Sequence, residues 1–114
     1  MADCIFCKIA AGEAPANKVH EDDRLVAFRD INPQAPTHLV LIPRKHVASL
    51  NDLSEADDGI VGHLVRVAGD LARRERIAEK GYRLVANCGP EAGQSVDHLH
   101  FHLLGGRSLR WPPG

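Results

Sequence analysis

Three histidines alternate with apolar residues in the segment His98-Leu99-His100-Phe101-His102. In an extended strand successive side chains point to opposite faces, so the three imidazoles would share one face and the apolar side chains the other. Histidines two positions apart lie about 6.5 Å apart along a strand, close enough to contact one phosphate group together. A neutral imidazole is also a competent nucleophile near neutral pH. The spacing therefore predicts a centre that acts on a phosphate group.

Two other interpretations of this run remain open from the residues alone. It could be an exposed strand face that carries histidines without a function, although strict alternation directly after a turn makes this the weaker interpretation. It could also be a metal site formed by a His-x-His pair.

The segment directly upstream of the run could bind an anion. Gly93-Gln94-Ser95-Val96 is short, flexible and polar, and successive backbone amides in such a turn can point at a phosphate oxygen. The Ser95 hydroxyl could give a proton to a departing group. Taken alone the segment would be only a turn, but next to His100 it is a candidate oxyanion site.

The chain has three cysteines, two of them in the motif Cys4-x-x-Cys7. In a reducing compartment an odd cysteine count favours metal binding over a disulfide framework, and leaves Cys88 as a free thiol. Zinc takes four ligands in a tetrahedron, so two histidines from elsewhere would complete a closed structural site. The alternative is that Cys4 and Cys7 are small buried residues without a metal.

The elements that must position these groups follow from the local patterns. Strands are predicted where β-forming or alternating residues are bounded by Gly, Pro, Asn or Asp, at 17–21, 25–30, 38–42, 82–87 and 98–104. Between the third and fourth strands, apolar residues recur at helical spacing from Ile60 to Ala72. Ser54-x-x-Asp57 can start this long helix and Gly81 can stop it. A shorter helix is expected near residues 4–11. The order of elements favours an α+β fold with a five-stranded antiparallel sheet.

Length and composition limit the possible functions. The 114 residues, 44% of them hydrophobic, suit one domain over 1–114, with an irregular tail at 105–114. The formal net charge of -1 lacks the clustered positive field of a general nucleic-acid binder, so a bound nucleotide should be small. The first residues lack a signal-peptide pattern, and no apolar run approaches membrane-spanning length. We expect a cytoplasmic protein without a membrane or nucleic-acid partner.

Several further motifs accompany the histidine run, namely Phe28-Arg29-Asp30-Ile31, Pro33-Gln34-Ala35-Pro36-Thr37-His38, Ile42-Pro43-Arg44-Lys45-His46 and Trp111-Pro112-Pro113-Gly114. With the run and the segment before it, this ordered set resembles the histidine triad (HIT) family, and most closely its Hint branch. The resemblance covers nearly the whole chain. It implies a HIT-like fold in a homodimer whose two sheets join edge to edge, with the tail contributing to the dimer. Asp97 and Cys88 depart from the best-known Hint members.

The resemblance also implies a reaction. Hint-type enzymes hydrolyse purine nucleoside 5'-phosphoramidates such as adenosine 5'-phosphoramidate and release AMP. The residue matching His100 attacks the α-phosphorus and forms a covalent nucleotidyl-histidine, which water then cleaves. By the same matching, His102 donates to a phosphate oxygen, His38 and His98 orient and polarise the nucleophile, and Ser95 helps to protonate the leaving amine.

The implied nucleotide-binding residues come from the other motifs. Asp30 would accept hydrogen bonds from the ribose hydroxyls, since a carboxylate can hold a vicinal diol with two bonds, and Ile31 would form an apolar plate for the base. Asn87 would lie near the phosphate, and Trp111 would reach toward the partner's active site. The remaining contacts would come from the phosphate-binding segment, Gly93, Gln94, Ser95 and Val96.

The resemblance completes the metal site as Cys4, Cys7, His46 and His98, with structural zinc. No cofactor is then needed for the chemistry itself. The alternative functions are a dinucleoside polyphosphate hydrolase or nucleotidyltransferase of a neighbouring HIT branch, and a nucleotide-binding regulatory module without turnover. His20 and His63 carry no functional signal and are expected in a solvated turn and on a helix surface.

Overall fold

Five antiparallel strands form the sheet that carries the histidine run, in the order β1-β2-β3-β5-β4. The computed structural model describes residues 3–114, so Met1 and Ala2 of the expected 1–114 domain lie outside the described residues. The strands are β1 Lys18–Glu21, β2 Leu25–Arg29, β3 Thr37–Pro43, β4 Tyr82–Val85 and β5 Phe101–Gly105, and the helices are α1 Ile5–Ala10 and α2 Asp58–Arg74. The predicted antiparallel α+β architecture, with one long and one short helix, is confirmed.

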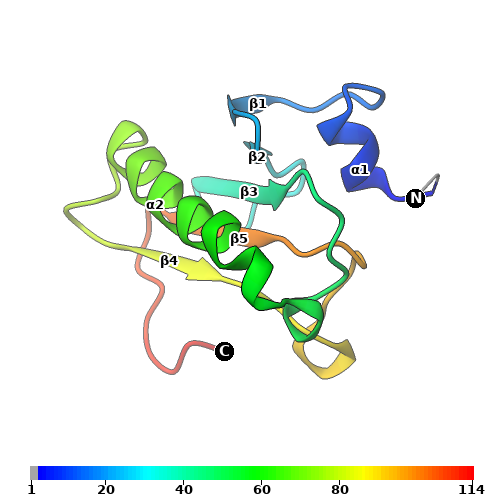
Figure 1. The fold of residues 1–114 in the computed structure, drawn as a ribbon. Helices are drawn as coiled ribbons and strands as arrows, with labels where there is room; N and C mark the ends of the chain where they lie inside the picture. Colours follow the sequence, from blue (N-terminus) through cyan, green and yellow to red (C-terminus); the bar gives the residue numbers. More distant parts are fainter. Residues whose placement is uncertain (1–2) are drawn as a thin grey trace.

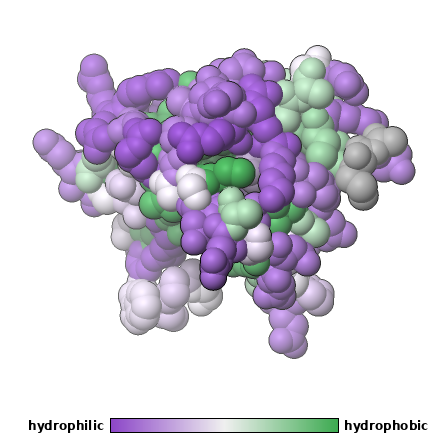
Figure 2. All heavy atoms as spheres, in the orientation of Figure 1, coloured by the Kyte–Doolittle hydropathy of each residue, from purple (hydrophilic) through white to green (hydrophobic). Residues whose placement is uncertain are grey.

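The two helices cover opposite faces of the sheet (Figure 1). One core cluster joins buried α2 residues such as Leu64 and Leu71 to Leu39, Leu41 and Leu103 of β3 and β5. The other cluster joins Ile9 and Ala10 of α1 to apolar residues of β2 and β3. The side of α2 turned toward the viewer is mainly hydrophilic (Figure 2), as expected of an amphipathic surface helix.

The start of α2 agrees with the predicted signal, but its end does not. The Asp57 carboxylate accepts a hydrogen bond from the Ser54 backbone N–H at 3.0 Å, directly before the helix. The helix ends at Arg74, not at Gly81. Arg76 takes a left-handed conformation with φ 61°, and the Ile77 N–H bonds back to the Ala72 carbonyl at 3.0 Å. This is a Schellman-type end with arginine where glycine is usual, so no residue type in the sequence signals it.

Strand β5 begins at Phe101, three residues later than predicted. Phe101 pairs with Leu41 of β3. Continued by two positions, this register would set Pro43 opposite Leu99, and Pro43 has no N–H to donate to a ladder. The Leu99 N–H bonds instead to the Val47 carbonyl at 2.6 Å. The predicted alternation nevertheless continues through this lead-in, because Leu99 and Phe101 both lie in the cluster beneath α2.

The turn between β1 and β2 is tied to α2 through Asp22. The Asp22 Oδ2 atom lies 2.7 Å from Nε2 of His20 and 2.7 Å from Nε2 of His63, while its Oδ1 accepts from the backbone amides of Arg24 and Leu25. Only 12% of the His63 side chain is exposed, so it is more buried than the helix-surface position that the sequence predicted. Its physical role is to join two elements.

Among residues 3–114, neither helix has the length and apolarity needed to cross a membrane. The last residue of β5 is Gly105, and the segment after it contains no helix or strand. Arg83 of the edge strand β4 holds this tail by donating to the Arg110 carbonyl at 2.6 Å.

Candidate active site and metal centre

A cavity of about 520 Å³ lies on the α1 side of the sheet, where the histidine face points. Its polar lining comes from Arg29 and Asp30 at the end of β2, from Ser95, and from His100 and His102. Its apolar wall is formed by Ile5, Phe6, Ile9, Ala14, Pro15, Ala16, Phe28, Ile31, Val40 and Val96. The mixture of a large apolar wall and a few convergent polar groups is typical of a small-molecule site.

The His100 ring is oriented from both sides. Its Nδ1 lies 2.7 Å from the carbonyl oxygen of His98, which can only accept, so this nitrogen carries the proton. The lone pair of the neutral ring is therefore on Nε2. The edge of Phe6 packs against the ring, with centroids 5.0 Å apart at 77°. A buried ring with a fixed tautomer and an available Nε2 lone pair is what an imidazole nucleophile requires.

His38 lies against His102, which in turn lies beside His100. The backbone N–H of Gln34 donates to Nδ1 of His38 at 3.0 Å, so the neutral His38 carries its proton on Nε2. That Nε2–H faces Nδ1 of His102 at 2.9 Å. His102 must then accept on Nδ1, which leaves its own proton on Nε2 as a donor on the cavity side.

Both histidines of this pair are neutral at neutral pH. Burial lowers the pKa of His38 and outweighs the attraction of the nearby Asp30 carboxylate. Burial, with the neighbouring His100 and His38 rings, lowers the pKa of His102 to about 4. The site therefore offers a neutral N–H donor at His102, and its orientation is fixed by hydrogen bonding.

Asp30 and Ile31 stand together at the cavity mouth. The Asp30 Oδ1 atom accepts from the backbone N–H of Asn32 at 2.8 Å, and its Oδ2 lies 3.4 Å from Nε2 of His38. The Ile31 side chain is 100% exposed, although it lines the cavity. A fixed carboxylate beside an uncovered apolar side chain can contact both a sugar and a planar base.

The segment before the histidine run is held in shape by Gln94. The Gln94 Oε1 accepts from the Gly89 N–H at 3.1 Å, and its Nε2 donates to the carbonyls of Ala48 and Val96 at 2.8 and 3.0 Å. The Gln94 side chain thus organises the loop, while Ser95 and Val96 line the cavity.

Three other residues of the predicted nucleotide site do not line the cavity. These are Asn87, Gly93 and Trp111. The Trp111 residue is 84% exposed in the single chain.

The predicted metal ligands come together from three segments. One ligand atom from each of Cys4, Cys7, His46 and His98 lies within 4.8 Å of the others. Nδ1 of His98 lies 3.3 Å from the Cys4 Sγ and 3.5 Å from the Cys7 Sγ, and Nδ1 of His46 lies 3.3 Å from the Cys7 Sγ.

The chemistry of this group fits zinc. Nε2 of His98 lies 2.8 Å from the Pro43 carbonyl, so it carries the proton and the Nδ1 lone pair points at the two sulfurs. Two thiolates and two imidazoles in a closed cluster are a usual structural zinc set. The His98 ring therefore belongs to the metal group, and its influence on His100 runs through its backbone carbonyl.

A second group of possible ligands, Asp30, His38 and His102, lies within the same 4.8 Å limit. A metal on Nε2 of His38 would require that nitrogen to lose its proton, and the neutral ring would then carry a proton on Nδ1. That proton would face the Gln34 N–H, donor against donor. The hydrogen bonding thus favours a proton-carrying pair over a metal site here.

Two residues at this site had no functional signal in the sequence. Phe6 holds His100, and Gln34 sets the tautomer of His38 through its backbone amide. The sequence predicted a short helix near Phe6, but not what this side chain packs against. A backbone donor such as the Gln34 amide has no residue-type signal at all.

The family model described as "Scavenger mRNA decapping enzyme C-term binding" matches residues 3–109 of this chain. A curated relative, the 14 kDa zinc-binding protein of Zea mays, is 50% identical over 96% of this chain and 87% of its own length. The purine nucleoside phosphoramidase of Escherichia coli (strain K12) is 47% identical over 94% of this chain and 90% of its own length.

A solved structure also matches nearly the whole chain. The crystal structure of a HIT family hydrolase from Legionella pneumophila Philadelphia 1 matches with a TM-score of 0.96 and 53% identity, over 98% of this chain and 100% of that one.

Proposed function

The chain belongs to the HIT family, and from this we propose that it is a purine nucleoside phosphoramidase. It cleaves the P–N bond of nucleoside 5'-phosphoramidates such as adenosine 5'-phosphoramidate and releases AMP. The observation that carries the proposal is the fixed tautomer of His100, whose Nδ1–H is given to the His98 carbonyl at 2.7 Å. Its Nε2 lone pair is thereby free for attack on phosphorus.

The first step forms a bond from His100 Nε2 to the α-phosphorus and breaks the P–N bond. The departing amine takes a proton, which the Ser95 hydroxyl at the cavity wall can supply. The His102 Nε2–H donates to a non-bridging phosphoryl oxygen as negative charge develops there. Water then attacks the nucleotidyl-histidine and gives its proton to the Ser95 oxygen, which releases the nucleoside monophosphate and restores both the serine hydroxyl and the neutral imidazole.

Binding of the nucleotide is assigned to the rest of the cavity. The Asp30 carboxylate accepts hydrogen bonds from the ribose hydroxyls, and Ile31 contacts the base. The backbone amides of Ser95 and Val96 hold phosphoryl oxygens, in a loop shaped by Gln94. Asn87 and Gly93 remain proposed phosphate-side residues, because the substrate can draw the loop closer.

We propose that zinc is bound by Cys4, Cys7, His46 and His98. The convergence of all four ligand atoms supports this. When bound, the metal supplies a cross-link between the N-terminal segment and the strand lead-in, and it takes no part in the bond changes. The chemistry belongs to His100 and its neighbours alone.

We further propose one domain over residues 1–114 that acts as a homodimer in the cytoplasm, on small nucleotides without a nucleic-acid or membrane partner. In support, β4 is an edge strand of the sheet, and open strand edges are common sites of strand pairing. Trp111 is exposed in the single chain and would reach the partner's site. Light scattering after size exclusion measures the oligomeric state directly.

The proposal is tested by steady-state hydrolysis of adenosine 5'-phosphoramidate by the wild type and His100→Ala, with diadenosine polyphosphate assayed beside it. We expect turnover of the phosphoramidate and a loss of about 10³-fold or more in the variant. His20→Ala, which removes a histidine that does not line the cavity, should keep the wild-type rate. Rapid quenching and mass spectrometry should find AMP on the wild-type peptide that contains His100.

Other results would assign the protein differently. Turnover of the polyphosphate alone would move it to a neighbouring HIT branch. Nucleotide binding without turnover of either substrate would make it a regulatory module.

A further inference from the structure

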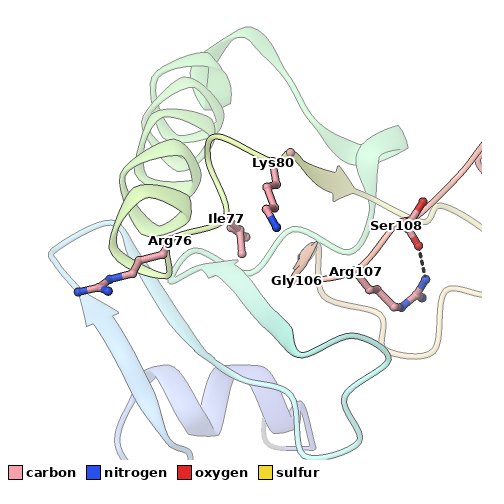
Figure 3. Close-up of a pocket in the computed structure, with 7 residues that line it drawn as sticks. Arg76, Ile77, Lys80, Gly106, Arg107 and Ser108 are labelled. Atoms are coloured by element: carbon pink, nitrogen blue, oxygen red, sulfur yellow. Dashed lines mark hydrogen bonds between the residues drawn. The ribbon is translucent and has the colours of Figure 1, made fainter.

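Arg107 lies two residues after the end of β5, in the segment that the sequence predicted as an irregular tail, yet its guanidinium is held by three hydrogen bonds. Nε and Nη2 donate to the Gln34 carbonyl at 3.2 and 3.0 Å, and Nη1 donates to the Ser108 carbonyl at 3.0 Å. Figure 3 shows this side chain turned toward Ser108 and away from the cavity that it borders. The residue therefore contacts the chain itself and is not arranged to hold a ligand in that cavity.

Arg107 holds the same residue whose backbone amide orients the histidine pair, namely Gln34. Gln34 gives its backbone N–H to Nδ1 of His38 at 3.0 Å, and its side chain donates to the Asn32 carbonyl at 2.9 Å. Its carbonyl, on the other side of the residue, is the acceptor for Arg107. Gln34 is thus fixed at its amide, its side chain and its carbonyl, and the carbonyl contact comes from a charged donor, which makes a stronger hydrogen bond.

The Gln34 amide decides where two protons lie. With the amide in place, His38 carries its proton on Nε2 and gives it to Nδ1 of His102 at 2.9 Å. If the amide turned away, His38 could carry the proton on Nδ1 and accept a hydrogen bond on Nε2. His102 would then be protonated on Nδ1, and its Nε2 lone pair would face the phosphoryl oxygen in repulsion.

We propose that Arg107 is a positioning residue for catalysis, which holds Gln34 so that His38 and, through it, His102 keep the tautomer with a proton on Nε2. The kinetic consequence rests on the proposed function, whereas the tautomer itself does not. Asp30 Oδ2, 3.4 Å from Nε2 of His38, favours the same tautomer at a longer distance. Loss of Arg107 should therefore yield a mixture of tautomers and not a complete reversal.

The test is Arg107→Met, examined by two-bond ¹⁵N–¹H correlation spectra that distinguish protonated from bare ring nitrogens. In the wild type we expect His38 and His102 to be protonated on Nε2 only. In Arg107→Met we expect mixed tautomers at both rings, and a fall in kcat/KM of about three- to tenfold. Because a substrate binds productively only to the competent fraction, kcat/KM should fall by the same factor as the Nε2-protonated population of His102.

Two further variants make the test specific. Lys80→Met removes a positive charge from the same cavity (Figure 3) without touching Gln34, and should leave both the spectra and kcat/KM unchanged. Arg107→Lys keeps the charge with a single donor group and should recover part of the wild-type tautomer population.

Two outcomes would overturn the proposal. Wild-type tautomers in Arg107→Met exclude the tautomer control itself, whatever the activity. Mixed tautomers with unchanged kcat/KM, in a wild type that hydrolyses the phosphoramidate, exclude the catalytic role. A wild type that hydrolyses nothing would refute the proposed function, while the spectra would still decide whether Arg107 sets the tautomer.

Discussion

Substituting Cys4 by serine should remove the metal and lower the thermal stability by a predictable amount. The Cys4 sulfur serves both as a member of the metal group and as the N-cap of α1, where it accepts from the Cys7 N–H at 3.3 Å. Serine is a good N-cap residue but a poor zinc ligand. The variant therefore separates the metal contribution from the local helix contribution.

The magnitude follows from the chain segments that the metal joins. Cys7 and His46 are 39 positions apart in the sequence, and closing a loop of that length covalently stabilises a fold by about 4 kcal/mol in the chain-entropy model. Binding of zinc by cysteines in the unfolded chain reduces the effect, so we expect a loss of about 2 to 4 kcal/mol. With the usual unfolding entropy per residue, a chain of 114 residues would then unfold about 8 to 16 °C lower.

The assay combines metal analysis with thermal unfolding followed by circular dichroism. Wild-type protein should contain about one zinc per chain, by the four-ligand logic of a structural site, and a strong chelator should lower its Tm to that of Cys4→Ser. Cys88→Ser is the matched control, since Cys88 is a free cysteine outside the group. Metal-free wild type with an unchanged Tm on addition of zinc would refute the reasoning, and so would equal Tm values for a zinc-loaded wild type and a zinc-free Cys4→Ser.

Three further predictions concern the substrate, the pH dependence and the packing. Asp30→Asn should raise KM about tenfold for the ribonucleoside phosphoramidate, because hydrogen bonds to a charged acceptor contribute about 1.5 kcal/mol or more. An equal rise in KM for a 2',3'-dideoxy substrate, which lacks the ribose hydroxyls, would contradict this. Burial alone would raise the pKa of Asp22, but hydrogen bonds from His20, the Arg24 amide and His63 hold the pKa of that carboxyl well below its usual range. The stabilisation by Asp22 is thus present above the ordinary carboxyl pKa and is lost as the pH falls through the lowered pKa. Urea titrations should therefore find the loss of unfolding free energy in Asp22→Asn largest near pH 7 and smaller below about pH 4. A loss that does not depend on pH would contradict this prediction. Gly105→Ala should cost about 1 to 3 kcal/mol, because the added Cβ would lie 2.6 Å from Cδ1 of Ile77, and the Gly105→Ala/Ile77→Val double variant should lose less than the sum of the single changes.

Much of the site could be predicted because its groups lie in short, periodic or spaced motifs. The alternation of His98 to His102 assigned the polar and apolar faces correctly, even though β5 begins only at Phe101. The Cys4-x-x-Cys7 spacing predicted a pair of candidate metal ligands, and Cys4 caps the short helix that contains Cys7. These features are local, since side-chain direction depends only on whether the backbone is extended or helical.

What the sequence could not determine is which partners meet across the fold. The register of β3 and β5 sets His38 opposite Leu104 and Val40 opposite His102. His38 and His102 are therefore diagonal neighbours on the same face of the sheet, where their rings make contact. The end of α2 could not be predicted either, because arginine is a common helical residue and its type does not indicate the left-handed conformation that Arg76 adopts.

His98, whose ring and backbone carbonyl have different partners, shows most clearly what the sequence could not determine. The sequence by itself determined that His98 would be both close to the nucleophile and a possible metal ligand. Only the tertiary structure decided that its ring turns to the cysteines while its carbonyl orients His100. The reason is physical: a histidine ring has two nitrogens, and the Pro43 carbonyl, 55 positions away in the chain, fixes which of them carries the proton.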